Sequence, residues 1–295
     1  MTWLGSTITA TIGALGDAKI GFVAAALVVD TFALVLMAFR WRLLLRSLGS
    51  AATLWNALLA SSAGVCACNL TPARTLGGDA CRAALIRRSG GTAVKAIAAS
   101  VVYDRATDVA GILMLSVIAL PTLKPNSPHW TLLLLLAVAA ALVARPLYRW
   151  FGTRIGQWHE AVIGGELNVS VAAAVVCSLV IWSLDVARIT LLACAFDVRL
   201  RPSQAAAISL LRLGSGLVPV PAGLGVVDGA LVAGFIWLGL PPATAAALAI
   251  VERAIVYGWG TALGAAALLL LGGSRALKKV HAGAGRFDLA PGARA

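Results

Sequence analysis

The sequence has few charged residues for its length, and few of those are acidic. Only 12% of its 295 residues are charged, whereas a soluble domain carries about 25%. This scarcity argues against a water-soluble domain. The hydrophobic residues make up 60% of the chain and come in blocks near the roughly 20 residues that a membrane-spanning helix needs. Because the blocks lack the alternation of apolar and polar residues typical of strands, we predict transmembrane helices.

Histidine is also rare, and no cysteines have a metal-binding spacing. The three histidines lie apart in polar connections, and Cys66 and Cys68 are separated by a single residue, which is closer than the usual spacing of metal ligands. We therefore expect no metal site and no cofactor. The formal net charge is +12, but no basic stretch is interleaved with aromatic residues, so we expect no nucleic-acid partner.

Apolar blocks and Pro/Gly breaks divide the chain into predicted spans. Long spans are expected at residues 20–39, 94–120, 131–144, 169–195 and 243–271, and short apolar helices at 55–70, 204–218 and 231–240. Residues 3–18 are mildly apolar, and we expect them to lie in the interface or to span partially. Arg40, Arg42 and Arg46 follow the first span, and we expect them at one membrane face.

Two of the basic clusters bear on the topology, one after the first span and one before the span at 94–120. Cytoplasmic loops carry an excess of Lys and Arg. Both clusters lie on that side only if helix 55–70 enters the membrane, turns at Pro72–Gly78 and returns. The same reasoning makes 204–240 a second re-entrant hairpin, entering from the opposite side. We predict a multi-pass protein of the cytoplasmic (inner) membrane, with its basic loops and its basic C-terminal tail, 272–295, in the cytoplasm.

Two broken stretches repeat half a chain apart. In the order proline, aspartate and acidic–arginine pair, the first half has Pro72, Asp79 and Asp104–Arg105, and the second has Pro221, Asp228 and Glu252–Arg253. Corresponding positions are 148 or 149 residues apart. We therefore predict one all-α polytopic membrane domain with two inverted repeats, about 20–120 and 168–271, joined by a linking span at about 131–146. Each repeat would hold a re-entrant helical hairpin between long transmembrane helices.

Charged residues inside the spans are candidate binding residues, because an unpaired charge at the bilayer centre costs about 3 kcal/mol or more. Asp30 is one of these charges. Arg105 and Asp108 are three residues apart, as are Asp185 and Arg188, so each pair should share a helix face. The pairs could be structural clips, or their arginines could bind phosphate oxygens. The candidate substrate-binding residues are Arg74, Asp79, Arg82, Asp104, Arg105, Asp108, Arg188, Arg212, Asp228, Glu252 and Arg253.

Several short motifs occur in a fixed order along the chain, between about residues 20 and 271. They are Arg40–Trp41, Pro72, Arg74, Gly77–Gly78–Asp79, Arg82, Asp104–Arg105, Asp108, Pro221, Gly223–Leu224–Gly225, Asp228 and Glu252–Arg253. In this order the chain resembles the lysyl-phosphatidylglycerol synthase transmembrane family. The resemblance implies a lipid flippase, whose cargo in the family ranges over aminoacylated phospholipids, with polyprenyl-phosphate and hopanoid lipids also proposed. We expect an anionic or polyprenyl-phosphate lipid as partner, and a homo-oligomer is compatible with the pattern.

Two other functions stay open at this point. One is a membrane-embedded phosphatase of polyprenyl (di)phosphate, and the other is a non-catalytic scaffold for a membrane lipid enzyme. A phosphatase needs a nucleophile or base near its arginines, but the first broken stretch offers only Thr71, Thr75 and Asp79, and residues 219–229 contain no Ser, Thr or Arg. The synthases also carry an aminoacyltransferase domain, for which 295 residues leave no room. We therefore expect a transporter without catalytic residues.

Overall fold

The computed structural model describes residues 2–71, 75–88, 92–122, 166–216, 218, 220 and 223–272. Every regular element in these ranges is helical, so the predicted all-α class is confirmed for them. The elements are α1 (Thr2–Gly16), α2 (Ile20–Ser47), α3 (Leu54–Leu70), α4 (Thr75–Arg88), α5 (Val94–Ala119), η1 (Leu120–Thr122), α7 (Glu166–Ala195), α8 (Pro202–Ser215), α9 (Val226–Trp237), α10 (Pro242–Arg253), the π-helical η3 (Ala254–Trp259) and α11 (Gly260–Leu270).

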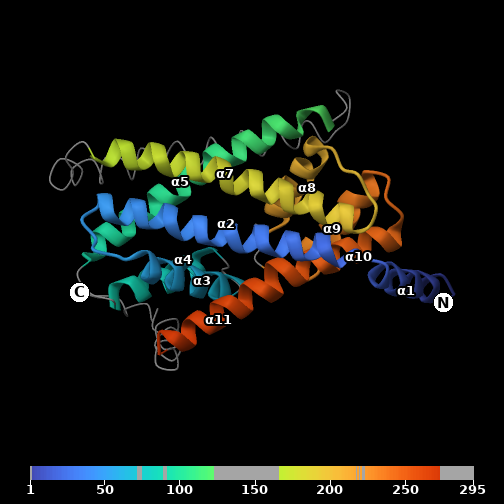
Figure 1. Cartoon of the computed structure of the whole chain (residues 1–295), viewed down its shortest axis with the longest axis horizontal. Helices are drawn as coiled ribbons and strands as arrows, with labels where there is room; N and C mark the ends of the chain where they lie inside the picture. Colours follow the sequence, from blue (N-terminus) through green and yellow to red (C-terminus); the bar gives the residue numbers. More distant parts are fainter. Residues whose placement is uncertain are drawn as a thin grey trace, which may run out of the picture.

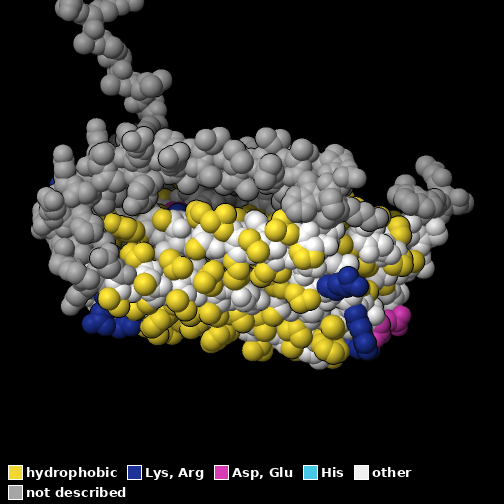
Figure 2. Space-filling view, turned by 90° about the horizontal axis from the view of Figure 1, so that it is seen from above, with side chains coloured by type: hydrophobic (Ala, Val, Ile, Leu, Met, Phe, Trp, Pro, Cys, Tyr) yellow, Lys and Arg dark blue, Asp and Glu magenta, His cyan; other side chains and the backbone are white. Residues whose placement is uncertain are grey.

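Three helices of the described residues are long and apolar enough to cross a membrane. They are Ile20–Ser47, Val169–Ala195 and the continuous helix Pro242–Leu270. At 1.5 Å per residue, the 28 residues of α2 extend about 42 Å, which exceeds a hydrocarbon core of about 30 Å. Large apolar side chains such as Val28, Phe32 and Val117 are exposed. On the face seen in Figure 2, hydrophobic side chains cover the middle and Lys and Arg lie toward the two ends, as expected of a surface in contact with lipid.

Helices α2 and α7 lie side by side and antiparallel at the centre of the molecule (Figure 1). The short helices form two pairs, α3 with α4 and α8 with α9. Two helices pack on a short helix of the other half of the chain. They are α5, which packs on α8, and α11, which ends the continuous helix Pro242–Leu270 and packs on α3. The two halves are therefore interlocked and not merely placed next to each other.

The connections lie at two opposite ends of this bundle. At one end, the Ser50 and Thr92 hydroxyl oxygens are 2.7 Å apart, which brings the start of α3 and the region after α4 together. At the other end, the backbone N–H of Lys19 donates to the Ala195 carbonyl oxygen at 2.9 Å. The first end carries the basic residues Arg46, Arg87, Arg88 and Lys95, and the second carries Lys19, Arg199 and Arg201. The α3–α4 pair therefore starts and finishes at the same end of the molecule.

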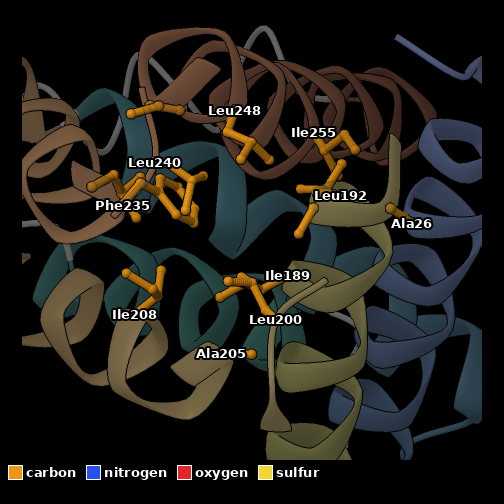
Figure 3. Close-up of a cluster of buried hydrophobic side chains, with 14 of the residues drawn as sticks. Ala26, Ile189, Leu192, Leu200, Ala205, Ile208, Phe235, Leu240, Leu248 and Ile255 are labelled. Carbon is orange, nitrogen blue, oxygen red and sulfur yellow. The ribbon is translucent and has the colours of Figure 1, made fainter. Parts of the chain in front are cut away.

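Two buried apolar clusters hold the short helices in place. One contains Ile189, Ile208, Phe235 and Leu248 from α7, α8, α9 and α10 (Figure 3). The other surrounds α3 and α4 and includes Trp41 of α2 together with apolar residues of α11. Small residues allow the close packing that membrane helices favour, and a Cβ on Gly78 would lie only 2.7 Å from the backbone oxygen of Gly64.

The structure corrects three boundaries of the sequence prediction. Helix α2 continues to Ser47 instead of ending at Phe39, so Arg40 lies inside the helix with 1% exposure rather than at a membrane face. Helix α4 already begins at Thr75, within the predicted break. Helix α9 begins at Val226 instead of Leu231 because the Asp228 carboxylate accepts the N–H of Gly225 at 2.9 Å and caps its first turn.

Some predicted features lie outside the described residues. They are Pro72, Arg74, Pro221, the linking span at about 131–146 and residues 273–295 of the basic tail.

Candidate functional site

A network of ion pairs surrounds Arg40 in the first half of the chain. The Arg40 guanidinium lies 2.9 Å from Asp104 and donates to Asp108 at 2.5 Å. It also donates to the Ser178 hydroxyl of α7 at 2.6 Å. Asp104 is 2% exposed at its side chain and pairs in addition with Arg82 of α4 at 2.8 Å. Helices α2, α4, α5 and α7 are therefore joined by charge-assisted contacts inside the bundle.

A second network surrounds Arg188 of α7 in the other half. Arg188 donates to Asp185 at 2.7 Å and to Glu252 at 3.1 Å, and its Nε lies 3.5 Å from Asp30 of α2. Arg212 of α8 donates to Asp185 at 2.7 Å and lies 3.5 Å from Glu252. The side chains of Arg188 and Glu252 are only 2% and 1% exposed, so these charges depend on each other for compensation.

One further ion pair accompanies each network. Arg105 donates two hydrogen bonds to Asp79, at 3.0 and 2.6 Å. Arg253 donates to Asp228 at 2.8 Å, and its guanidinium lies 3.9 Å from the centre of the Tyr257 ring. The first pair joins α4 to α5, and the second joins α9 to the end of α10. In each half, an ion pair therefore connects a short helix to the helix that follows it.

A cavity of about 420 Å³ lies between the two networks. Seven of its lining residues are charged: Asp30, Arg40, Arg105, Asp108, Asp185, Arg188 and Arg212. The rest of its wall is apolar, with Leu34, Ile112, Ile181 and Trp182 among the contributors. Val256 and Gly260 bring the π-helical turn η3 and the start of α11 to the wall. Such a mixture of arginine forks and apolar surface can hold a molecule with a charged head and a hydrocarbon tail.

The candidate residues predicted from sequence fall into groups by position. Arg105, Asp108, Arg188 and Arg212 line the cavity. Asp79, Asp104 and Glu252 lie behind its wall and form ion pairs with the lining arginines. Arg82 also lies outside the lining and pairs with Asp79 and Asp104. Asp228 and Arg253 pair with each other away from the lining. The two within-helix pairs, Arg105 with Asp108 and Asp185 with Arg188, have the predicted contacts, at 3.5 and 2.7 Å.

Sequence reasoning left three lining residues, Asp30, Arg40 and Asp185, out of the candidate set. For Arg40 a signal was present, because Arg40 and Arg188 are 148 positions apart, as are Asp104 and Glu252. The ion pairs Arg40–Asp104 and Arg188–Glu252 therefore occupy corresponding positions in the two halves. No comparable spacing marks Asp185, whose counterpart at that offset is Met37.

The apolar helices, the lipid-facing surface and the buried ion pairs define a helical membrane protein with an internal, partly charged cavity. The chain matches the family described as the lysylphosphatidylglycerol synthase TM region over residues 2–264. It therefore belongs to that family, as the motif order suggested.

Two archaeal relatives match along most of their length. A UPF0104 membrane protein of Methanothermobacter thermautotrophicus is 26% identical over an alignment of 300 positions, which covers 88% of this chain and 88% of the relative. Another UPF0104 membrane protein, from Methanocaldococcus jannaschii, is 23% identical over an alignment of 284 positions, which covers 85% of this chain and 84% of the relative.

Proposed function

We propose that this protein is a flippase that moves a lipid with a phosphate-bearing head between the leaflets of the inner membrane. The observation that carries the proposal is the single cavity between the two networks, with arginines at its charged ends and apolar side chains along its wall. A water-filled channel for a small ion would not need that apolar wall. An amphipathic lipid uses both parts.

Two arginines of the cavity are accessible enough to reach a head group. The side chains of Arg105 and Arg212 are 45% and 20% exposed, whereas those of Arg40 and Arg188 are 1% and 2% exposed. Each guanidinium has several N–H donors, and a planar fork fits two oxygens of a phosphate. We propose that Arg105 and Arg212 contact the head first, and that Arg40 and Arg188 set the charge of the cavity behind them.

We further propose that the two halves are inverted repeats with re-entrant hairpins. In support, α3 and α8 begin 148 positions apart, as do α5 and α10. The packing of α5 on α8 matches that of α11 on α3. Inverted halves around one midplane site allow that site to face each leaflet in turn. The end that carries Arg46, Arg87, Arg88 and Lys95 would be cytoplasmic because basic residues are retained there.

An enzymatic role is the weaker candidate. Among the described residues, the cavity lining contains no Ser, Thr, Cys or His that could act as a nucleophile beside the arginines. A phosphatase would need such a group. The proposal is therefore transport without covalent chemistry.

The decisive experiment is reconstitution into phosphatidylcholine vesicles that contain fluorescent phosphatidylglycerol, phosphatidic acid or polyprenyl phosphate. Dithionite quenches only the outer leaflet, so movement of lipid appears as loss of the protected fluorescence. We expect faster loss than in empty vesicles for at least one of these lipids, and at least tenfold slower movement with Arg105→Gln or Arg212→Gln. Arg46→Gln, at the exposed end of α2, is the matched control and should move lipid at the unaltered rate. Protein vesicles that quench like empty ones with all three lipids would reject the flippase.

A further inference from the structure

The acidic and basic side chains of the two networks and their accompanying pairs balance except at one residue. In the first half, Arg40, Arg82 and Arg105 face Asp79, Asp104 and Asp108. In the second half, Arg188, Arg212 and Arg253 face Asp185, Asp228 and Glu252. Among the residues that the structure describes, these six arginines therefore face six carboxylates, and Asp30 is a seventh carboxylate, in contact with Arg188.

Asp30 is also the carboxylate that the arginines hold most loosely. Its contact with the Arg188 Nε is an ion pair at 3.5 Å, while Arg188 donates hydrogen bonds to Asp185 and Glu252. Asp185 and Glu252 each contact both Arg188 and Arg212. The Asp30 side chain is 23% exposed and lines the cavity, so it can leave Arg188 more easily than the other two carboxylates.

The corresponding position in the other half has a neutral group. The residue 148 positions after Asp30 is Ser178, and its hydroxyl accepts a hydrogen bond from Arg40 at 2.6 Å. The two central arginines, Arg40 and Arg188, thus each contact the residue at the same place on the opposite central helix. A hydroxyl is sufficient at this position beside Arg40, which pairs with the carboxylates of Asp104 and Asp108. The carboxylate at Arg188 is not required by the geometry and calls for another role.

The groups that face Asp30 come from several helices. They are Asp185 and Arg188 of α7, Arg212 of α8 and Glu252 of α10, with Arg105 and Asp108 of α5 in the same cavity. From α3 and η3, which also adjoin α2, the lining residues are Val65 and Val256. A second negative charge placed beside Asp30 would therefore meet no free cation among these residues, and an uncompensated buried charge is strongly unfavourable.

We propose that Asp30 binds a proton whenever a lipid phosphate occupies the cavity, so that the protein co-transports a proton with an anionic lipid. The inference rests on the proposed flippase function. Once Arg105 or Arg212 has bound the head group, one of its phosphate oxygens takes over the Arg188 Nε–H, and the released Asp30 carboxylate accepts one proton from water at the cavity mouth. When the lipid leaves toward the other leaflet, Asp30 returns to Arg188 and gives the proton to water on that side. No other bond is made or broken.

The test uses the same three fluorescent lipids in phosphatidylcholine vesicles with the pH indicator pyranine inside. One proton taken up per lipid makes lipid binding change about tenfold per pH unit. With a small amount of fluorescent lipid added to the outer leaflet, we therefore expect the initial rate of inward movement to rise by up to tenfold when the outer pH is lowered by one unit. Inward lipid movement should acidify the lumen.

Three variants separate the proton site from the transport function. Asp30→Ser reproduces the neutral group that faces Arg40, and Asp30→Asn keeps the side-chain shape. Both should still move lipid, but with a rate that changes less than about twofold over the same pH step and with no lumenal acidification. Asp17→Asn, in the exposed turn before α2, is the control and should behave like the unaltered protein. Gel filtration in detergent verifies that each variant is folded.

The outcomes are distinguishable. Lipid movement by the unaltered protein without any pH effect or acidification would overturn the proton inference and leave the flippase standing. Coupling that persists in both folded Asp30 variants would also overturn it. If none of the three lipids moves, the flippase proposal and this inference are both rejected.

Discussion

The networks around Arg40 and Arg188 share a central ion pair but differ in the charged residues around it. Arg40–Asp104 and Arg188–Glu252 lie at corresponding positions, at 2.9 and 3.1 Å. Around Arg40 the additional charges come from α4 and α5, whereas around Arg188 they come from α2, α7 and α8. The comparison teaches that the common framework specifies the central pair, while each half neutralises it with neighbours of its own.

The largest expected effect comes from removing the central arginines. Arg188→Leu leaves Asp185 and Glu252 with Arg212 as their basic partner and takes from Asp30 its ion pair with Arg188, so we expect a loss of about 3–5 kcal/mol in stability. Arg40→Leu should cost less, because Asp104 retains Arg82 and Asp108 retains Arg105. Thermal unfolding in detergent, followed by tryptophan fluorescence, measures both losses.

A further substitution sharpens this comparison. Adding Asp30→Asn to Arg188→Leu should recover part of the loss, because it removes a carboxylate that has lost its cation. Equal melting temperatures for the Arg40 and Arg188 variants would contradict the unequal sharing of charge described above.

An intermediate effect is expected for the accompanying pairs. Asp79 accepts two hydrogen bonds from Arg105 and also pairs with Arg82, so Asp79→Asn should lower stability by about 1.5–3 kcal/mol. Asp228 accepts one hydrogen bond from Arg253 and one from the backbone of Gly225, so we expect about 1 kcal/mol for Asp228→Asn. The same unfolding assay ranks the two variants, and a larger loss for Asp228→Asn would show that the helix cap contributes more than the contacts of Asp79.

The last comparison is between a glycine of α4 and a glycine of α9, and the substitution in α9 has the smallest expected effect. A Cβ at Gly78 of α4 would lie 2.7 Å from the backbone oxygen of Gly64, and backbone cannot move aside cheaply, so Gly78→Ala should cost about 1–3 kcal/mol. A Cβ at Gly229 of α9 meets no atom within 4 Å among the described residues. Gly229→Ala should therefore be neutral or stabilise by up to about 1 kcal/mol. A drop in melting temperature for Gly229→Ala as large as that for Gly78→Ala would contradict the difference in the space around these two glycines.

Much of the helical framework could be predicted from sequence, because it depends on local properties. Apolar length predicted α3, α5 and α7 within a few residues of their observed bounds. The predictions failed where a distant group changes a local preference. The arginine that follows Phe39 reads as the end of a span, yet Asp104 and Asp108 neutralise Arg40 and allow α2 to continue. Likewise, the glycine-rich stretch before Asp228 reads as a break, but the carboxylate caps a helix there.

The sequence by itself determined that this is a helical membrane protein, that its spans contain charges, and that some of those charges recur 148 or 149 positions apart. Hydropathy and spacing are properties of the chain alone, so no fold is needed to read them. Only the tertiary structure decided which carboxylate meets which arginine and that both networks border one cavity. It also decided that Asp30 contacts Arg188 where Ser178 contacts Arg40. Coulomb interactions weaken with distance and strengthen as water is removed. The state of each buried charge is therefore set by neighbours from other helices, which only folding brings together.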